Sequence, residues 1–352
     1  MDEEGELNVS GYFFGNEMGS IEILSGNTAL TGYTIAGWKG LREDEWDDDG
    51  NNDEECNRGK GAALDGVIYY TGIEFKEEGM YYVLWKYTLP GDTHIYVGTS
   101  GWVSTYMDHQ TVDLGAMITG VLSAKKGYFN YYVELETAGK CLEWCIEHLA
   151  LDEVGIYLNK VKVTDVESRY ISLYDYLSDE VNKVPPGSNG VIFTPWLHGN
   201  RCPFEDSNAG GMFFNLRVDN GKRDMIRAVI EGVCFHLRWL LECEMKKVKT
   251  SDTIRFVGGG ALSSVACQLL SDITGRRVET VYNTQEVGAV GTALVVAAGI
   301  KGEDVLDLSR RLVKVKHVYK PNTAFKEIYD RNYKVFKRLY RSNAENFKLL
   351  NT

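Results

Sequence analysis

Apolar residues recur every three or four positions in several segments of the chain, which is the spacing of an amphipathic helix. These segments cover residues 138–149, 226–244, 265–273, 287–298 and 325–340. Short runs of β-branched and aromatic residues, typical of strands, cover residues 67–70, 73–75, 81–87, 94–97, 253–257 and 278–281. Strands that alternate with helices predict an α/β domain. Residues 1–60 are acidic and turn-rich, with weak periodicity.

The basic C-terminal segment is predicted to be a helix rather than a nucleic-acid-binding arm. Residues 301–352 carry 13 Lys and Arg against 6 Asp and Glu, a balance of +7 in a chain whose net charge is −12. Aromatic residues recur there every three or four positions, at Phe325, Tyr329, Tyr333, Phe336 and Tyr340. They define one apolar helix face, so the lysines and arginines form the solvated face.

Composition narrows the class of protein. The net charge of −12 argues against nucleic acid or an anionic membrane as partner. No apolar run approaches the roughly 18 residues of a membrane span, and the acidic residues 1–4 are unlike the basic start of a signal peptide. The seven cysteines are scattered, odd in number and without a C-x-x-C pair. We therefore expect reduced thiols in a cytoplasmic protein.

Two clusters of metal-binding residue types have simpler interpretations. The acidic segment 43–56 approaches the spacing of a calcium loop, but Cys56 stands where the bidentate carboxylate belongs. An exposed acidic loop is the favoured interpretation. Cys141, Cys145 and His148 share one face of a predicted helix and could approach a zinc ion. Without a fourth ligand, core packing is favoured there, and we predict no protein-bound metal.

Three short glycine-bearing segments follow predicted strands. They are Gly98-Thr99-Ser100-Gly101, Gly258-Gly259-Gly260-Ala261 and Gly288-Ala289-Val290-Gly291-Thr292-Ala293. The first lies between two strands, as in a hairpin tip whose backbone N–H groups can close on a phosphate. The second is expected to be a turn that opens a helix, whose positive end favours phosphate. Their spacing matches neither the P-loop nor the dinucleotide fingerprint. Three such segments in order predict a nucleotide site.

Together with the segments between them, these glycine motifs resemble the FGGY family of carbohydrate kinases. The likeness is to its C-terminal, ATP-binding domain, with xylulokinase-like members closest. It rests on residues 94–101, 136–144, 195–204, 210–216, 227–233 and the two later glycine segments, which are expected as turns. The resemblance covers about residues 91–345. It implies residues 91–352 as the nucleotide-binding domain and leaves residues 1–90 unassigned, as a truncated or diverged N-terminal region.

The resemblance implies a ribonuclease-H-like (actin-like ATPase) α/β fold. It also implies transfer of the γ-phosphoryl group of ATP to a sugar hydroxyl, with ATP and Mg²⁺ as cofactors. The positions similar to the family's ATP contacts are Gly98, Thr99, Ser100, Gly101, Gly139, Glu143, Gly258, Gly259, Gly260 and Ser264. Because an acid would repel phosphate, Glu143 is expected at the ribose or base. A plain turn glycine is the alternative for Gly260, and a structural role is the alternative for Ser264.

The chain also departs from the family pattern. Nothing before residue 91 resembles the family's N-terminal domain, which carries a phosphate loop and most sugar contacts. We therefore expect this chain to supply mainly the ATP-binding half. The catalytic residues stay unassigned, because the candidate carboxylates Glu77 and Asp65 lack the expected surroundings or spacing. The alternative function is a non-catalytic nucleotide-binding or interaction module derived from a sugar kinase.

Partners follow from the same reasoning. The predicted small-molecule partner is a sugar, and the predicted macromolecular partner is a missing kinase half or a second copy of the chain. A half-kinase should expose the apolar surface of its interdomain cleft, which drives association. The residues expected at that surface are Trp102, Trp196, Phe204, Phe213 and Phe214.

Overall fold

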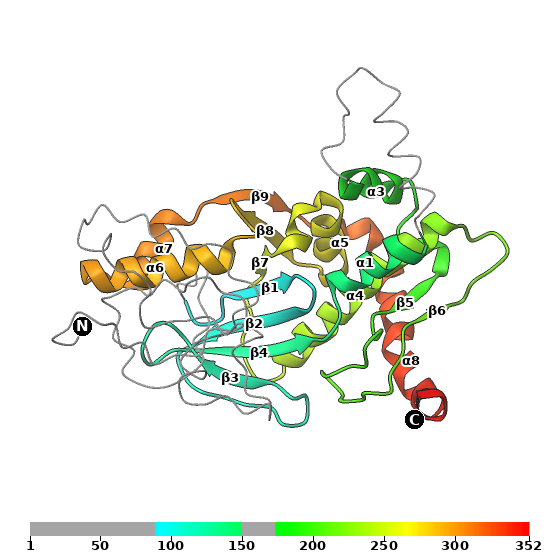
Figure 1. Cartoon of the computed structure of the whole chain (residues 1–352), viewed down its shortest axis with the longest axis horizontal. Helices are drawn as coiled ribbons and strands as arrows, with labels where there is room; N and C mark the ends of the chain where they lie inside the picture. Colours follow the sequence, from blue (N-terminus) through cyan, green and yellow to red (C-terminus); the bar gives the residue numbers. More distant parts are fainter. Residues whose placement is uncertain (1–88, 150–172, 352) are drawn as a thin grey trace, which may run out of the picture. The chain divides into compact units, whose positions relative to one another are not determined.

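The computed structural model describes residues 89–149 and 173–351 of the 352-residue chain. Residues 89–149, 173–294 and 304–351 belong to one compact unit, and residues 295–303 belong to another. The first unit holds a seven-stranded sheet in the order β3-β4-β2-β1-β7-β8-β9 (Figure 1). Its strands are β1 Thr93–Val97, β2 Gly101–Met107, β3 Thr119–Leu122, β4 Phe129–Leu135, β7 Thr253–Val257, β8 Arg277–Val281 and β9 Val315–Tyr319.

The sheet is mixed. Strand β1 pairs parallel with β7, and β7 pairs parallel with β8. The other neighbours pair antiparallel, including β1 and β2, which form a hairpin. Strands β5 Ile192–Thr194 and β6 Met212–Phe214 form a separate two-stranded sheet. The carboxyl ends of three adjacent strands therefore lie at the same edge of the large sheet.

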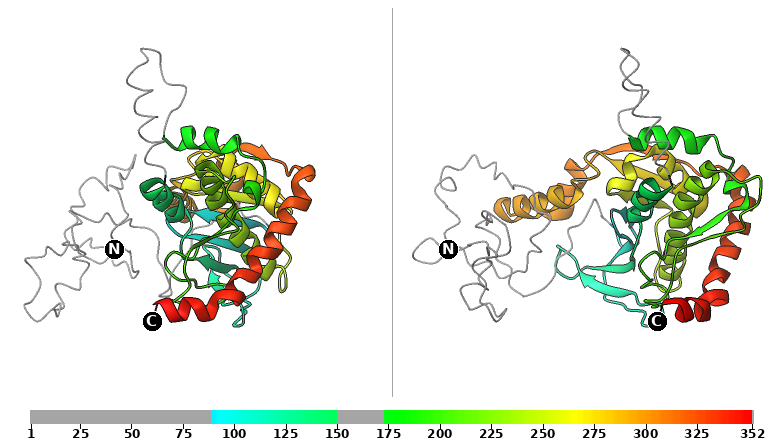
Figure 2. Two further views of the ribbon diagram at one scale, coloured as in Figure 1. Left: turned by 90° about the vertical axis from the view of Figure 1, so that its right-hand side faces the viewer. Right: turned by 45° about the vertical axis from the view of Figure 1, so that its right-hand side comes forward.

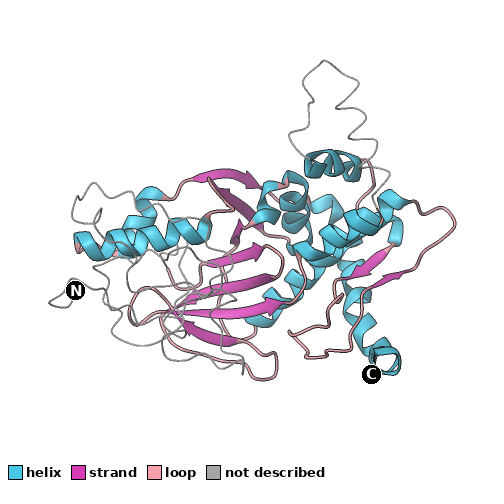
Figure 3. Ribbon diagram, in the orientation of Figure 1, coloured by secondary structure: helices cyan, strands magenta, loops and turns pink. Residues whose placement is uncertain are grey.

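The described part of the chain also forms helices (Figure 3). They are α1 Gly139–His148, α3 Leu173–Asn182, α4 Lys222–Glu244, α5 Ser264–Thr274, α6 Val287–Lys301, α7 Val305–Leu312 and α8 Lys326–Asn351, with short 3₁₀ turns η3 Ser188–Gly190, η4 Gly259–Leu262 and η5 Thr323–Phe325. Helix α4 contacts β2, β4 and β5 and also packs on α1, α5 and α8. Its apolar side chains are therefore buried around most of its circumference.

The aromatic repeat of the basic C-terminal segment lies almost entirely in helix α8, as predicted. In Figure 2, α8 (red) runs beside α4, which it contacts. Tyr329, Tyr333 and Phe336 are almost fully buried along the face that meets the core. The aliphatic part of Lys337 extends along that face, since its ammonium group lies 4.4 Å from the centre of the Tyr333 ring. Helix α8 carries seven Lys and Arg against three Asp and Glu, so more than half of the positive excess of residues 301–352 belongs to an amphipathic helix.

A buried ion pair ties α4 to α8 and to the turn before β5. Arg227 Nε donates to Glu231 Oε1 at 2.7 Å, and Tyr329 Oη donates to the same oxygen at 3.2 Å. Glu231 also accepts hydrogen bonds from Gly187 N–H at 3.0 Å and Ser188 Oγ at 2.8 Å. The carboxylate is thereby satisfied, as a buried charge must be. This network gives segment 227–233, which resembles a family motif, a structural role.

The expectation that Trp196 lies on an exposed apolar surface is wrong. Its side chain has no exposed surface, whereas the cleft hypothesis placed it on an exposed apolar face. It packs against Phe336 of α8 with ring centres 5.9 Å apart, and its Nε1–H donates to His236 Nδ1 at 3.1 Å. Phe204 and Phe213 are half-buried, while Phe214 is 43% exposed. Trp196 is therefore a core residue, and only part of the expected surface is open.

Most of the predicted elements in the described region are confirmed. Strands over 94–97, 253–257 and 278–281 correspond to β1, β7 and β8, and the helices over 138–149, 226–244 and 265–273 correspond to α1, α4 and α5. The third glycine segment lies inside α6, so the expectation of a turn there is wrong and that of a helix is right. The strands predicted at 67–70, 73–75 and 81–87, the acidic segment 43–56, and Glu77 and Asp65 lie outside the described residues.

No helix within residues 89–149 and 173–351 is both long enough and apolar enough to cross a bilayer.

Candidate functional site

All three glycine segments follow the carboxyl ends of neighbouring parallel strands. Tyr96 on β1 lies opposite Val257 on β7, and the chain continues into residues 98–101 and 258–261 respectively. Strand β8, parallel to β7, ends at Val281, and α6 with the third segment begins six residues later at Val287. Ligands of α/β sheets bind beyond this edge, where loops and helix N-termini converge. The topology thus brings together segments that are far apart in sequence.

The first segment is a hairpin tip, as predicted. Gly98 N–H donates to Ser100 O at 2.9 Å, and the exposed Thr99 stands at the turn. The carbonyl oxygens of the tip face the start of α1. Gly98 O accepts from Gly139 N–H at 2.8 Å, and Thr99 O accepts from the N–H groups of Ala138 and Lys140 at 3.0 and 3.2 Å. By accepting these bonds the tip caps the N-terminus of α1. The residue at the N-cap position, Ala138, has no side chain that could cap the helix.

Gly139 is required by this contact. A Cβ atom at residue 139 would overlap the carbonyl oxygen of Gly98. Glu143, one turn further along α1, is 44% exposed and pairs with Lys140 Nζ at 3.0 Å. That pair reduces the negative charge of Glu143 toward any bound anion. The two residues of α1 that were predicted at the nucleotide therefore have different roles in the structure. Gly139 supports the hairpin, and Glu143 lies at the surface.

The three glycines of the second segment have three different surroundings. Gly258 has a φ of +88°, and a Cβ there would meet the carbonyl oxygen of Val97, so both backbone and space require glycine. A Cβ on Gly260 would lie 2.8 Å from Val97 Cβ, which makes packing inside the protein a sufficient reason for that glycine. Gly259 is exposed, and the nearest atom to a Cβ there is 3.9 Å away. Gly259 alone leaves space beside it that a ligand could use.

Helix α5 begins at this segment with a side-chain cap. Ser263 Oγ accepts from Ala266 N–H at 3.2 Å. Its hydroxyl also lies 3.0 Å from Ser178 Oγ on α3, so the two helices are joined at the start of α5. Ser264, the first residue of α5, is exposed beside the positive end of the helix. Ser263 and Ser178 were not among the residues predicted from the sequence, where a serine directly before an apolar helical repeat is the available signal for the cap.

The zinc hypothesis has no geometric support in the part of the chain that the structure describes. Cys141 and Cys145 are fully buried, whereas His148 is exposed. Burial raises the pKa of the Cys141 thiol to about 12, and its Sγ donates to Thr137 O at 3.5 Å. No three metal-ligating side chains come together within residues 89–149 and 173–351. These cysteines are core residues, as favoured from the sequence.

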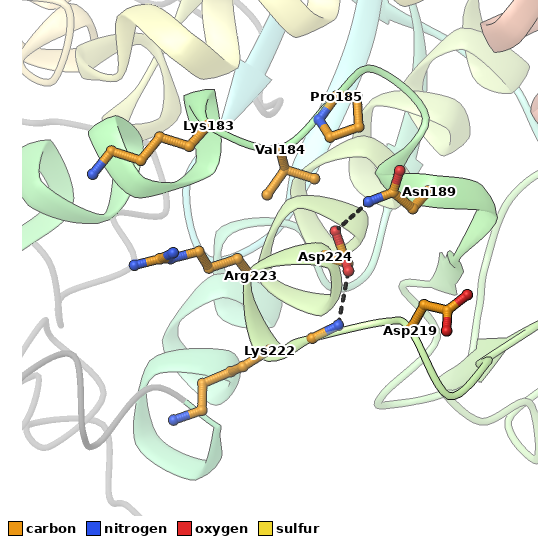
Figure 4. Close-up of a pocket in the computed structure, with 9 residues that line it drawn as sticks. Lys183, Val184, Pro185, Asn189, Asp219, Lys222, Arg223 and Asp224 are labelled. Carbon is orange, nitrogen blue, oxygen red and sulfur yellow. Dashed lines mark hydrogen bonds between the residues drawn. The ribbon is translucent and has the colours of Figure 1, made fainter.

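A pocket of about 480 Å³ lies elsewhere, between the end of α3 and the start of α4 (Figure 4). Asp224 caps α4 by accepting from Gly221 N–H at 2.8 Å and from Asn189 Nδ2 at 2.9 Å. The cations Lys183 and Arg223 both pair with Glu180. None of the ten predicted ATP-binding residues lines this pocket. Two of its cations are thus paired within the protein and no predicted contact lies there, so the sheet edge remains the better candidate site.

Known proteins share both the sequence and the fold of this region. The chain is 31% identical over 256 residues to the xylulose kinase of Lactococcus lactis, covering 71% of this chain and 46% of that protein. It is 31% identical over 240 residues to the gluconokinase of Bacillus subtilis, covering 66% and 41%. The crystal structure of ligand-bound xylulose kinase from Lactobacillus acidophilus superposes with a TM-score of 0.63 at 24% identity, covering 74% and 49%.

These comparisons establish the fold and the family. The structural likeness confirms the α/β architecture of the ribonuclease-H-like, actin-like ATPases. The chain spans half or less of the length of the curated relatives that it matches. Residues 93–300 match the C-terminal domain of the FGGY carbohydrate kinases. On this evidence the chain belongs to the FGGY family of carbohydrate kinases.

Proposed function

We propose that this chain supplies the ATP-binding part of a sugar kinase that transfers the γ-phosphoryl group of ATP to a sugar hydroxyl. The observation that carries the proposal is the convergence of three glycine segments at the carboxyl ends of β1, β7 and β8. The hairpin tip 98–101 and the N-terminus of α5 offer backbone N–H groups and a positive helix end, both suited to phosphates. A xylulose-type sugar is the acceptor we favour, since relatives of that kind are similar to the chain.

Within this proposal the nucleotide lies along residues 98–101 and 258–264. Gly259 leaves open space and Ser264 is exposed beside it, which suits the ribose or base, and Glu143 stands at the surface of α1. Mg²⁺ would enter as a complex with the ATP phosphates and neutralise charge that develops during transfer. The described residues hold no ready cluster of ligands for it. The acceptor also needs a carboxylate to orient or deprotonate it, and Glu77 and Asp65 remain the candidates for that role.

Calorimetry tests the nucleotide site. We expect the full chain to bind Mg·ATP and Mg·ADP, and to bind Mg·GTP more weakly. Gly259→Val should abolish binding without unfolding the protein, because the added side chain projects into open space. Gly221→Val is the matched control, since a Cβ there meets no atom within 4 Å, a Cβ on Gly259 meets none closer than 3.9 Å, and residue 221 lies outside the proposed site. Absence of heat with millimolar nucleotide and folded wild-type protein would refute the proposal.

The proposed setting is a cytoplasmic enzyme with a second kinase half or a second copy as partner. The partly open apolar surface around Phe214 supports association. Nucleotide binding without sugar-dependent turnover in any assembled form would favour the alternative, a non-catalytic module.

A further inference from the structure

An aromatic pair lies against both glycine turns of the proposed nucleotide site. The Tyr96 ring occupies the space in which a Cβ of Gly98 or of Gly258 would stand, since such a Cβ on Gly258 would lie 2.9 Å from Tyr96 Cε2. Gly98 belongs to the β1–β2 hairpin and Gly258 to the turn after β7, so one ring touches both segments. Those segments are separated by about 160 residues of chain. The ring therefore contacts both segments, beside the contacts that Val97 makes with Gly258 and Gly260.

Trp102 holds the Tyr96 ring in place. It lies directly opposite Tyr96 across the hairpin, and the two rings stack with centres 3.9 Å apart and planes 10° from parallel. Trp102 Nε1–H donates to His94 Nε2 at 2.9 Å, which fixes the indole. Burial, with a smaller contribution from Arg255, lowers the pKa of His94 to about 3. His94 is therefore neutral in any ordinary assay, and its Nε2 remains an acceptor for Trp102.

We propose that Tyr96 is a positioning residue for the phosphates of the nucleotide, held by Trp102 and His94. The inference rests on the proposed function and deepens it. The ring sets the spacing between the hairpin tip and the Gly258 turn, the two segments that would face the phosphates. Removing the ring leaves a gap into which the tip can move, so its N–H groups lose their alignment. The adenosine part of the nucleotide gains nothing from that spacing.

The test compares ADP with adenosine on the full chain. We expect Tyr96→Leu to weaken Mg·ADP binding by about tenfold or more and adenosine binding by less than about twofold. Calorimetry measures the first affinity and a ligand-observed NMR titration the second. Tyr96→Phe keeps the ring and should retain the wild-type ratio of the two affinities. Trp102→Phe keeps the stack but loses the donor to His94, and should give an intermediate ratio.

Tyr132→Leu is the matched control. Tyr132 touches the other side of Trp102, with ring centres 5.9 Å apart, but belongs to β4 and forms neither glycine contact. It should leave the ADP-to-adenosine ratio unchanged. The ratio also corrects for any loss of folded protein, because both ligands report on the same folded population. If Tyr96→Leu is too unstable to purify, Trp102→Phe carries the test.

Each outcome is decisive. Equal weakening of ADP and adenosine in the Tyr96 or Trp102 variants, or no change in either, overturns the positioning role while the nucleotide site stands. Wild-type protein that binds neither ligand overturns the proposed function and this inference with it. Selective loss of ADP affinity, restored in Tyr96→Phe, supports the inference.

Discussion

At the scale of single residues, buried histidines make the stability of this protein depend on pH. His236 is fully buried, accepts from Trp196 Nε1–H at Nδ1, and donates from Nε2 to Cys202 O at 2.8 Å. Both bonds require the neutral ring with its proton on Nε2. Burial lowers the pKa of His236 to about 4, although the bond to Cys202 O opposes this shift.

The first prediction concerns acid stability. Because the pKa of His236 is lower in the folded state than in the unfolded state, stability is full above about pH 6.5 and falls as the pH drops toward 4. Between pH 7 and pH 5 this residue alone should remove about 2 kcal/mol. His236→Gln can keep one donor and one acceptor but cannot titrate, so its unfolding free energy should fall less. Urea unfolding at both pH values measures this change in unfolding free energy. An equal change between pH 7 and pH 5 in wild type and variant would show that His236 is not the titrating group.

Glu244, at the end of α4, has the opposite dependence. Its side chain is fully buried, and Oε2 lies 2.6 Å from Thr105 Oγ1, which in turn lies 2.9 Å from Thr93 Oγ1. Thr93 donates its own proton to Gly91 O at 3.0 Å. With Glu244 protonated all three contacts can be hydrogen bonds, and with Glu244 ionised one of them lacks a proton. Burial raises the pKa of Glu244 well above its usual value, although a hydrogen bond from Thr105 opposes this shift.

The second prediction is therefore that Glu244→Gln stabilises the protein at alkaline pH. A carboxyl group with a raised folded pKa stabilises below its unfolded pKa, and this contribution is lost as the pH rises through the folded pKa. Glutamine keeps a donor and has no charge to bury. Chemical denaturation from pH 5 to pH 9 should show that the variant has the higher unfolding free energy, by an amount that grows as the pH rises. Glu147→Gln, at an exposed position of α1, is the control for the effect of the substitution itself. A difference in unfolding free energy that shrinks as the pH rises would contradict the raised pKa of Glu244.

At the scale of elements, the contact between the hairpin tip and α1 is the most specific local feature of the site. The third prediction is that Gly139→Ala lowers the free energy of unfolding by about 1–3 kcal/mol, since its Cβ would overlap Gly98 O and displace the tip. Nucleotide affinity should fall as well. Lys140→Ala, at a half-exposed neighbour, should stay within about 0.5 kcal/mol of wild type. Urea unfolding followed by calorimetry measures both effects, and an unchanged Gly139→Ala protein would show that the tip does not cap α1.

The elements that local patterns identified are those with strong periodicity. Helices α4, α5 and α8 and strands β1, β7 and β8 have long apolar repeats or compact β-branched runs. Local patterns could not predict the order of the strands. Strand β1 lies between β2 and β7, and these two strands are separated by more than a hundred residues in sequence. The third glycine segment was ambiguous for a local reason: Gly288 and Gly291 suit a turn, but the small residues around them form α6. The Tyr96–Trp102 stack depends on cross-strand register, which became visible only in the sheet.

At the scale of the whole molecule, family membership does not by itself give activity to this chain. The fourth prediction is that the purified chain releases ADP slowly and independently of added xylulose, ribulose, glycerol or gluconate. Holding the acceptor against ATP supplies on the order of 7–11 kcal/mol of barrier reduction, and the matched relatives are at least about twice the length of the region they share with this chain. An assay coupled to ADP release, run with and without each sugar, tests this prediction. Sugar-dependent turnover of roughly 1 s⁻¹ or more, within the usual kinase range, would show that the chain builds its own acceptor site.

The central claim is that nucleotide binds where three parallel strands end. Hydrogen–deuterium exchange of the full chain with and without saturating Mg·ADP tests it most directly, because it maps protection onto peptides without any mutation. We expect slower exchange in peptides that cover residues 98–101 and 258–264. Exchange in residues 183–189 and 219–224, around the pocket of Figure 4, should be unchanged. Protection confined to that pocket, or absent from both glycine segments while ADP binds, would contradict it.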